Sequence, residues 1–176
     1  MANKHAVVRT DLLWGTDVRS GLVSIKYIVE STVDSETVKT ETEIENGNVL
    51  KVGALMEGER EIYEGSAPTA SDDLNSIVLV ATPELLYDER LHNLDDFTNE
   101  AGRPCRGYRL HSGDVFSVTK EALDGVAAPA VGNVVELKAG TKLNVAASAT
   151  SGSTQVGEII AVDVVGRYTY YAIRVA

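Results

Sequence analysis

The apolar and polar residues alternate along much of the chain in the way that β-strands require. From Val23 to Val29 nearly every second residue is apolar, which is typical of a strand with one buried face. Ile77–Val80 is a continuous apolar run, which predicts a strand buried on both faces. Two longer runs, Val156–Val165 and Tyr168–Val175, follow near the end of the chain. The pattern therefore predicts a mainly β protein.

A short β phrase occurs twice in this pattern. Gly47–Val52 reads GNVLKV and Gly132–Leu137 reads GNVVEL, so each copy runs apolar, apolar, charged, apolar after Gly-Asn. Gly-Asn supplies the positive φ angles that tight turns need, and the run after it suits a pleated, half-buried surface. Regular hairpins of this kind favour a small antiparallel β-barrel or sandwich.

The best helix signals lie between residues 82 and 102, where we expect one or two short helices. Thr82 places a capping residue before a proline at the first helical position, which predicts a helical turn from Pro83 to about Asp88. Asn93 is a second candidate cap, because two aspartates follow it in the first turn. Gly102 would end this second helix.

We divide the chain into an extended N-terminal arm over residues 1–20 and a single β-rich domain over residues 21–176. The arm is polar except for Leu12, Leu13 and Trp14. Residues 31–45 are mostly Thr, Ser and acidic residues, and their alternation permits an exposed strand or a solvated loop. We interpret this segment as a surface insertion.

The charge of the chain narrows the classes of partner. It carries 26 acidic and 16 basic residues, a net charge of -10. A nucleic-acid backbone needs a basic footprint, so we expect no nucleic-acid partner. The acidic balance favours solubility and would suit a partner with basic patches. We expect no membrane insertion and no secretion by a signal peptide, because no apolar stretch has the required length.

Cys105 is the one cysteine and a candidate nucleophile. Arg103 and Arg106 flank it and could lower the pKa of its thiol, and His111 is the nearest candidate base. A structural cysteine beside surface arginines is the simpler interpretation. A disulfide within the chain is excluded by the count.

Paired carboxylates are the other candidates for acid–base chemistry or cation binding. The helix dipole explains the aspartates after Asn93, and a solvated strand face explains the glutamates. The groups are Asp72-Asp73, Asp95-Asp96 and Glu57/Glu59/Glu61. No spaced Cys/His pair, phosphate-binding loop or nucleophile motif is present, so we expect no metal, no cofactor and no enzymatic activity. A small β-barrel hydrolase or ligand-binding protein that uses Cys105 or the acidic pairs is the alternative.

Three segments resemble auxiliary head proteins of tailed bacteriophages. They are Gly47–Leu55 (GNVLKVGAL), which leads through Glu57–Arg60 to Tyr63, Arg106–Val118 (RGYRLHSGDVFSV), and Gly166–Tyr171 (GRYTYY). Together they look like small proteins encoded beside the major capsid protein in phages and prophages of Gram-positive bacteria. The part from Val131 to Val175 is also similar in style to head decoration proteins, which are called cement proteins.

The resemblance implies a non-enzymatic structural virion protein that binds and stabilises the outer surface of an assembled capsid. Such a protein is made in the host cytoplasm and resides on the capsid exterior. Its implied partners are the major capsid protein and copies of itself, with a trimer as the first expectation. A head-fibre base, a neck protein or a tail protein is the alternative within the virion.

The Leu12-Leu13-Trp14 cluster has two interpretations. It is either ordinary core packing of the first element or an anchor that the arm inserts into a capsid subunit or a neighbouring copy. Tryptophan is enriched at binding hot spots, which is the basis of the second interpretation. We therefore take Leu12, Leu13 and Trp14 as the candidate contact residues.

We predict that Trp14→Ala weakens binding to capsid shells while the thermal midpoint of the free protein stays nearly unchanged. Burial of a tryptophan at a contact contributes roughly 2 kcal/mol or more per site, so less protein should co-sediment with shells. If the substitution unfolds the free protein, Trp14 is a core residue and the anchor hypothesis is wrong.

Overall fold

The computed structural model describes residues 4–9, 21–33, 35–86, 90 and 93–176. Within these residues the chain forms twelve β-strands in two six-stranded sheets and no α-helix. The prediction of a mainly β fold is confirmed. The three short helices of the described residues are all single 3-10 turns.

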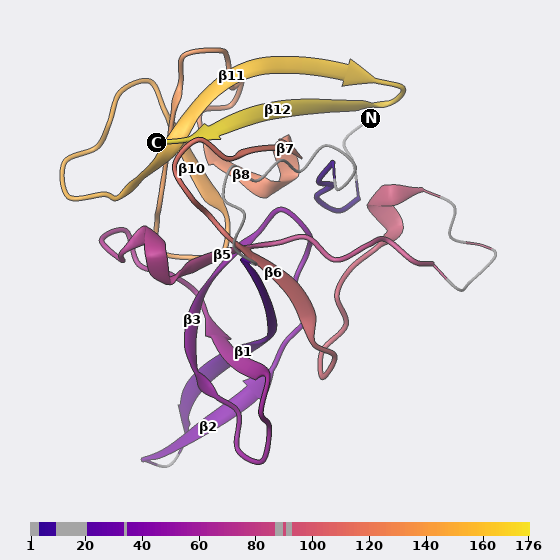
Figure 1. Cartoon of the computed structure of the whole chain (residues 1–176), viewed down its shortest axis with the longest axis vertical. Coiled ribbons are helices and arrows are strands. Elements are labelled where there is room, and N and C mark those ends of the chain that lie inside the picture. Colours follow the sequence, from indigo (N-terminus) through magenta and orange to yellow (C-terminus); the bar gives the residue numbers. More distant parts are fainter. Residues whose placement is uncertain (1–3, 10–20, 34, 87–89, 91–92) are drawn as a thin grey trace.

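The first sheet closes into a barrel. Its six strands are β1 (Leu22–Val33), β2 (Glu36–Glu41), β3 (Val49–Leu55), β4 (Ile62–Ser66), β5 (Ile77–Val80) and β6 (Cys105–Arg109). Their order is β2-β1-β4-β3-β5-β6, and β1 also pairs with β6, so that five strands form a closed ring. The remaining strand, β2, pairs with the outer part of β1 as a hairpin that projects from the barrel (Figure 1).

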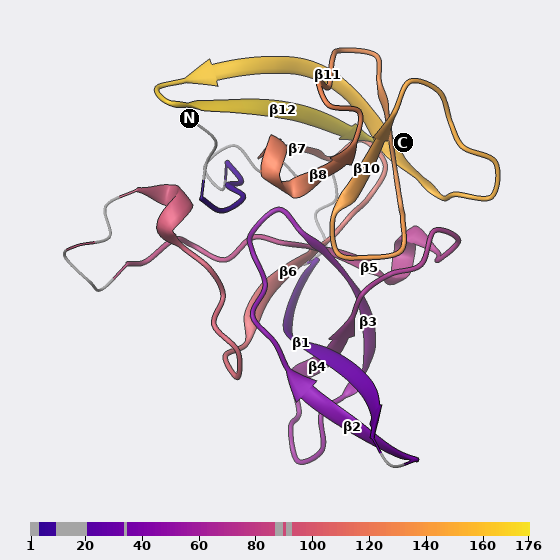
Figure 2. The ribbon, with the colours of Figure 1, turned by 180° about the vertical axis from the view of Figure 1, so that it is seen from behind.

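The second sheet is a curled half-barrel that lies against the barrel (Figures 1 and 2). Its strands are β7 (Val115–Thr119), β8 (Leu123–Gly125), β9 (Val134–Glu136), β10 (Leu143–Ala146), β11 (Gln155–Val165) and β12 (Tyr168–Val175). Their order is β7-β12-β11-β9-β10-β8. The two outermost strands, β7 and β8, are consecutive in the chain and are joined by the 3-10 turn Lys120–Ala122.

Both sheets use the same order of strand pairing. The first contains β1-β4-β3-β5-β6, and the second contains β8-β10-β9-β11-β12. The leading pair is parallel in both sheets, β1 with β4 and β8 with β10. The three other pairs are antiparallel in both. The repeated sequence phrase opens β3 and β9, which occupy the same place in the two orders.

The two Gly-Asn turns also make the same backbone hydrogen bonds. Gly47 N donates to Val80 O and Val80 N donates to Asn48 O, both at 2.8 Å. The second copy makes the corresponding bonds, which are Gly132 N to Ile159 O at 2.9 Å and Ile159 N to Asn133 O at 3.0 Å. Each turn thus holds one residue of a neighbouring strand. The sequence repeat marks a structural repeat.

The main apolar core lies between the barrel and the half-barrel, and a second core fills the barrel. Strand β5 belongs to both, because Ile77 and Leu79 lie in the main core while Val78 and Val80 lie inside the barrel. All four residues are fully buried. The predicted strand with two buried faces is therefore confirmed.

The helix predicted from Pro83 to about Asp88 is wrong for its described part, since residues 83–86 are not helical. Thr82 bonds elsewhere instead of capping a helix. Its N–H donates to Asn46 Oδ1 at 3.0 Å, and its hydroxyl accepts from Arg106 N at 3.0 Å. These long-range bonds outweigh the local helix signal.

The second helix signal produces only a 3-10 turn, Leu94–Asp96. Asn93 precedes it as the predicted cap, and Asn93 N donates to the Asp96 carboxylate at 3.3 Å. The predicted stop, Gly102, has a φ of 83° but lies in a turn six residues beyond the end of the 3-10 turn.

Residues 31–45 include the outer end of the β1–β2 hairpin. All six residues of β2 are exposed, and Ser35 turns the chain with a φ of 68°. Of the two forms that the sequence permits here, the exposed strand is the one observed. Lys39 on β2 pairs with Glu64 on β4 at 2.7 Å, which connects the hairpin to the barrel.

Gly47→Ala and Gly132→Ala form a matched test of the structural repeat. A side chain at positive φ costs about 1–2 kcal/mol, so both substitutions should lower the free energy of unfolding. A Cβ on Gly47 would also lie 2.9 Å from Ala122 Cβ, whereas a Cβ on Gly132 meets nothing within 4 Å. In urea denaturation we expect Gly47→Ala to destabilise by about 1 kcal/mol more. Equal losses would contradict the close packing at Gly47.

Candidate interaction site

The first described residues, 4–9, are part of the folded body and lie beside β7. Thr119 N donates to Val7 O and Arg9 N donates to Ser117 O, both at 2.9 Å. The three apolar side chains of this segment are at most 2% exposed: Ala6, Val7 and Val8. This part of the predicted arm therefore packs on the protein's own core.

Asp95 fastens this segment to two other parts of the chain. Its carboxylate accepts hydrogen bonds from Lys4 N at 3.0 Å, from the Tyr168 hydroxyl at 2.8 Å and from Arg167 Nη2 at 2.6 Å. Asp95 is 2% exposed. One buried carboxylate thus connects the N-terminal segment, the turn Leu94–Asp96 and the β11–β12 hairpin.

Burial and hydrogen bonding shift the pKa of the Asp95 carboxyl in opposite directions. Burial alone would raise its pKa, but the bonds from Lys4 N and Tyr168 and the charge of Arg167 hold the pKa of the carboxyl below its ordinary value. Burial and donation to Asp95 raise the pKa of the Tyr168 phenol. At neutral pH the carboxylate accepts and the phenol donates. The cluster is therefore a structural contact.

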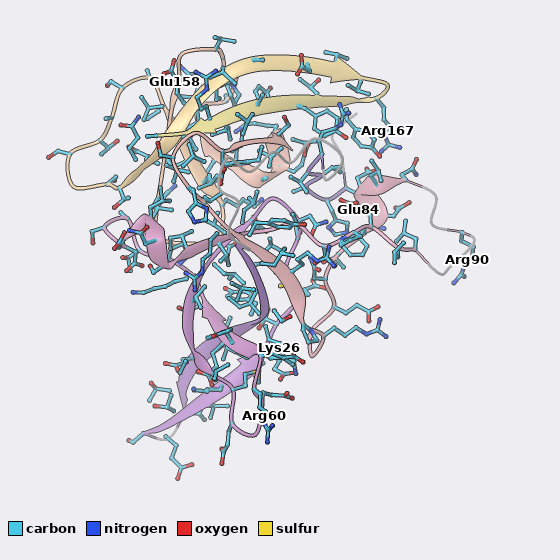
Figure 3. All side chains as sticks on the ribbon, viewed as in Figure 1. Lys26, Arg60, Glu84, Arg90, Glu158 and Arg167 are labelled. Carbon is cyan, nitrogen blue, oxygen red and sulfur yellow. The ribbon has the colours of Figure 1, made fainter. Side chains whose placement is uncertain are left out.

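A surface cavity of about 580 Å³ adjoins this cluster. Its lining residues are Val8, Arg9, Glu84, Leu94, Val165, Gly166, Arg167, Tyr168 and Tyr170. The Arg9 guanidinium lies 5.5 Å from the Tyr170 ring centroid, and that of Arg167 lies 5.2 Å from the Tyr168 centroid. Figure 3 shows Arg167 and Glu84 on the same side of the molecule. Tyr168 and Tyr170 are only 9% and 2% exposed, so the two stacked pairs belong to the packing of the folded body beside the cavity.

The predicted contact residues Leu12, Leu13 and Trp14 lie outside the described residues. Arg9 is the last described residue before them, and it lines the cavity. The anchor hypothesis therefore stays a prediction. The three residues follow Arg9, which lines the cavity, within five positions of the sequence.

Cys105 lies inside the barrel and is 3% exposed. Its thiol donates to Ile25 O at 3.1 Å, and burial raises the pKa of the thiol to about 12. A thiol with that pKa is almost wholly protonated at neutral pH and is a poor nucleophile. The proposed base, His111, instead faces Asp114, with Nδ1 3.6 Å from Oδ2.

Each acidic pair has a structural contact. Asp72 accepts from Lys51 Nζ at 2.6 Å, a bond that lowers the pKa of its carboxyl, and Asp73 accepts from Asn75 N at 3.0 Å. Asp96 bonds to the backbone of the Asn93 cap, as described above. The three glutamates of the third group are exposed, but the prediction that they share a strand face is wrong, because they lie in the connection between β3 and β4: Glu57, Glu59 and Glu61.

The histidines do not come together in the parts of the chain that the structure describes. His5 Nδ1 lies 2.8 Å from Glu45 Oε1, and His92 lies outside those parts. No group of three or more His, Cys, Asp or Glu side chains among the described residues is arranged to hold a metal ion. Across the same residues, none of the helices combines the length and apolar character of a membrane-spanning segment.

Comparison of the chain with family models, with curated proteins and with solved structures found no match.

The Asp95 cluster was not identified from the sequence. The dipole of a helix was a sufficient local explanation for Asp95, and its partners Lys4 and Arg167 are far away in the chain. The sequence Arg-Tyr-Thr-Tyr at 167–170 was the available signal, because it places an arginine in the turn directly before a strand that carries two tyrosines on one face.

Asp95→Asn should lower the free energy of unfolding by about 2 kcal/mol at neutral pH, because it removes the charge that pairs with Arg167 and replaces one of the two accepting oxygens by an NH2 group that cannot accept. The pKa of Asp95 is lower in the folded protein, so its contribution is complete above the unfolded value and is lost as pH falls through the folded value. The difference in free energy of unfolding between the wild type and the variant should therefore stay constant from about pH 7 to about pH 5 and shrink only as the pH falls below the ordinary aspartate pKa of 3.8.

The matched control is Asp124→Asn. Asp124 and Lys138 form an exposed pair at 3.8 Å, and exposed pairs contribute little. Urea denaturation across the pH range measures both variants. A loss at neutral pH no larger for Asp95→Asn than for Asp124→Asn would contradict the assigned role of Asp95.

Proposed function

We propose that this protein is a non-enzymatic structural component of a phage virion that binds and stabilises the outer surface of an assembled capsid. The observation that supports this most directly is the shape of the described chain. Two strand hairpins, β1–β2 and β11–β12, extend from a body with two packed cores (Figure 1). A rigid body with projecting hairpins can contact more than one subunit of a shell.

The distribution of charge supports a partner with basic patches. Residues 21–66 contain ten of the 26 acidic residues and four of the 16 basic ones. This segment forms β1 to β4, including the projecting β1–β2 hairpin. An acidic hairpin end favours approach to a positively charged surface and disfavours approach to another acidic one. On this proposal, the basic surface belongs to the major capsid protein.

Many equivalent sites on a shell also make weak contacts sufficient. Neighbouring copies that touch each other bind as a group, so modest affinity per copy gives stable coverage. We expect contacts between copies on the capsid exterior, with a trimer about a local symmetry axis as the first arrangement to test. Leu12, Leu13 and Trp14 are the proposed contact residues.

The alternative is a small β-barrel hydrolase or ligand-binding protein. A thiol mechanism is disfavoured by the burial of Cys105 and by its raised pKa. The acidic pairs take part in turns and ion pairs that the fold itself uses. Within the virion, a head-fibre base, a neck protein or a tail protein is distinguished from a decoration protein by its position on the particle.

The test mixes the purified protein with empty shells assembled from the capsid protein encoded beside it. We expect saturable co-sedimentation, with additional density on the outer surface in electron microscopy. Protein that stays in the supernatant, or that appears only at the neck or tail, would overturn the proposal.

Cys105→Ser is the matched variant for the enzymatic alternative. A serine hydroxyl can replace the thiol as donor to Ile25 O, so the barrel should stay folded. We expect the variant to bind shells as the wild type does. An enzyme that used the thiol would lose its activity with the same change.

A further inference from the structure

The β11–β12 hairpin has one open backbone edge. Strand β9 pairs with β11 only from Gln155 to Glu158, and the bonds from the Gly132 turn end at Ile159. On the other side, β12 pairs with β11 as far as Val165. Among the residues placed by the structure, none pairs with Ile160–Val165 on the side away from β12. Six successive residues thus present a free strand edge.

This edge is mostly apolar, and its protection is limited to one charged residue and to an irregularity in the pairing between Ile159 and Ala161, at its beginning. Its exposed valines are Val162, Val164 and Val165, at 40%, 73% and 45%, and Asp163 is its single charged residue. Natural proteins usually protect open edges with charged residues, prolines or bulges. Strand β2, also at a sheet edge, has three charged side chains in six residues: Glu36, Lys39 and Glu41. One projecting hairpin is therefore protected against strand pairing, and the other is suited to it.

We propose that the segment Ile160–Val165 pairs with the same segment of a second copy of this chain, antiparallel across a twofold axis. The free N–H and C=O groups of the edge are satisfied by another extended backbone, and valines on both faces favour an apolar strand. The charge distribution favours a second copy as the occupant. Residues 107–176 contain six acidic and six basic residues, whereas residues 21–66 carry the excess of negative charge. Two chains of net charge -10 repel each other least through the second sheet.

Asp163 selects the register of this pairing. Opposed residues of an antiparallel pair have their side chains on the same face, so Val162 can lie opposite Val162 or Val164 of the second copy. If Val162 faces Val164, the two Asp163 side chains face each other, which is unfavourable. With Val162 on the axis, Asp163 lies opposite Ala161 and Val164 lies opposite Ile160. The register with Val162 opposite Val162 therefore avoids any pair of like charges.

The contact is small, so the free protein should dimerise weakly and the pairing should strengthen where copies are concentrated. It does not depend on binding to a shell. A twofold contact would link copies in addition to any contact about a threefold axis. Its tests use the free protein, so that its failure and the failure of shell binding are separate results.

Cysteine cross-linking tests both the contact and its register. Opposed Cα atoms of an antiparallel pair lie about 4.5–5.5 Å apart, within the range that a disulfide spans. With glutathione disulfide as oxidant, two thiols of Val162→Cys join and the glutathione is reduced to its thiol. We expect at least about tenfold more covalent dimer from Val162→Cys than from Val33→Cys on the other hairpin. The native Cys105 is buried and should not react.

Val164→Cys serves as the register control, because its partner on the opposite strand is Ile160 and not itself. It should give much less dimer than Val162→Cys. A yield from Val162→Cys no higher than that from Val33→Cys would overturn the proposal. A yield from Asp163→Cys above that from Val162→Cys would overturn the register.

Sedimentation equilibrium provides a measurement without cross-linking. Val164→Lys places a charge on the open edge at a position that is 73% exposed, so the fold should be unaffected. We expect the wild type to show concentration-dependent dimerisation and Val164→Lys to raise the dissociation constant at least about tenfold. Val38→Lys on β2, whose native valine is 42% exposed, should leave the dissociation constant of the dimer unchanged. A wild type that stays monomeric at millimolar concentration would overturn the proposal.

Discussion

Both cores of the molecule depend on the burial of strand β5. Successive side chains of a strand point to opposite faces, so Ile77 and Leu79 enter the main core while Val78 and Val80 fill the barrel. A polar group at any of these positions would lose its water without a partner, in one core or the other. The Gly47 turn holds the end of this strand through Val80. The barrel and the half-barrel are one unit because a single strand belongs to the packing of both.

Local sequence signals were sufficient wherever the structure depends on neighbouring residues. The apolar run of β5, the Gly-Asn turns and the Asn93 cap were each visible in a few residues. Closure of the barrel was not, because it rests on pairing between β1 and β6, which are far apart in the chain. The same limit explains the incorrect helix after Thr82, where bonds to Asn46 and Arg106 replaced local capping. Local propensity is a weak determinant when such long-range bonds compete with it.

The candidate site shows the same division. A structural role for Cys105 was the simpler interpretation of the sequence, and the buried, hydrogen-bonded thiol agrees with it. The cluster around Asp95 was missed because its members come from three distant segments. A carboxylate in a first turn is fully explained by the dipole until its partners are known. A cluster of this kind consists of side chains from distant segments, so residues that are adjacent in the sequence predict only part of it.

The position of β12 has a consequence for folding during synthesis. Strands β1 to β6 end at Arg109, so the ribosome can complete the barrel while the rest of the chain is still being made. The half-barrel cannot form at that stage, because β12 lies between β7 and β11 in the sheet and is made after both of them. Val7 also cannot reach its packed position until β12 is made, since it packs with Tyr168 and Tyr170. The segment of residues 4–9 is therefore made before the barrel but packs only after β12 has been made.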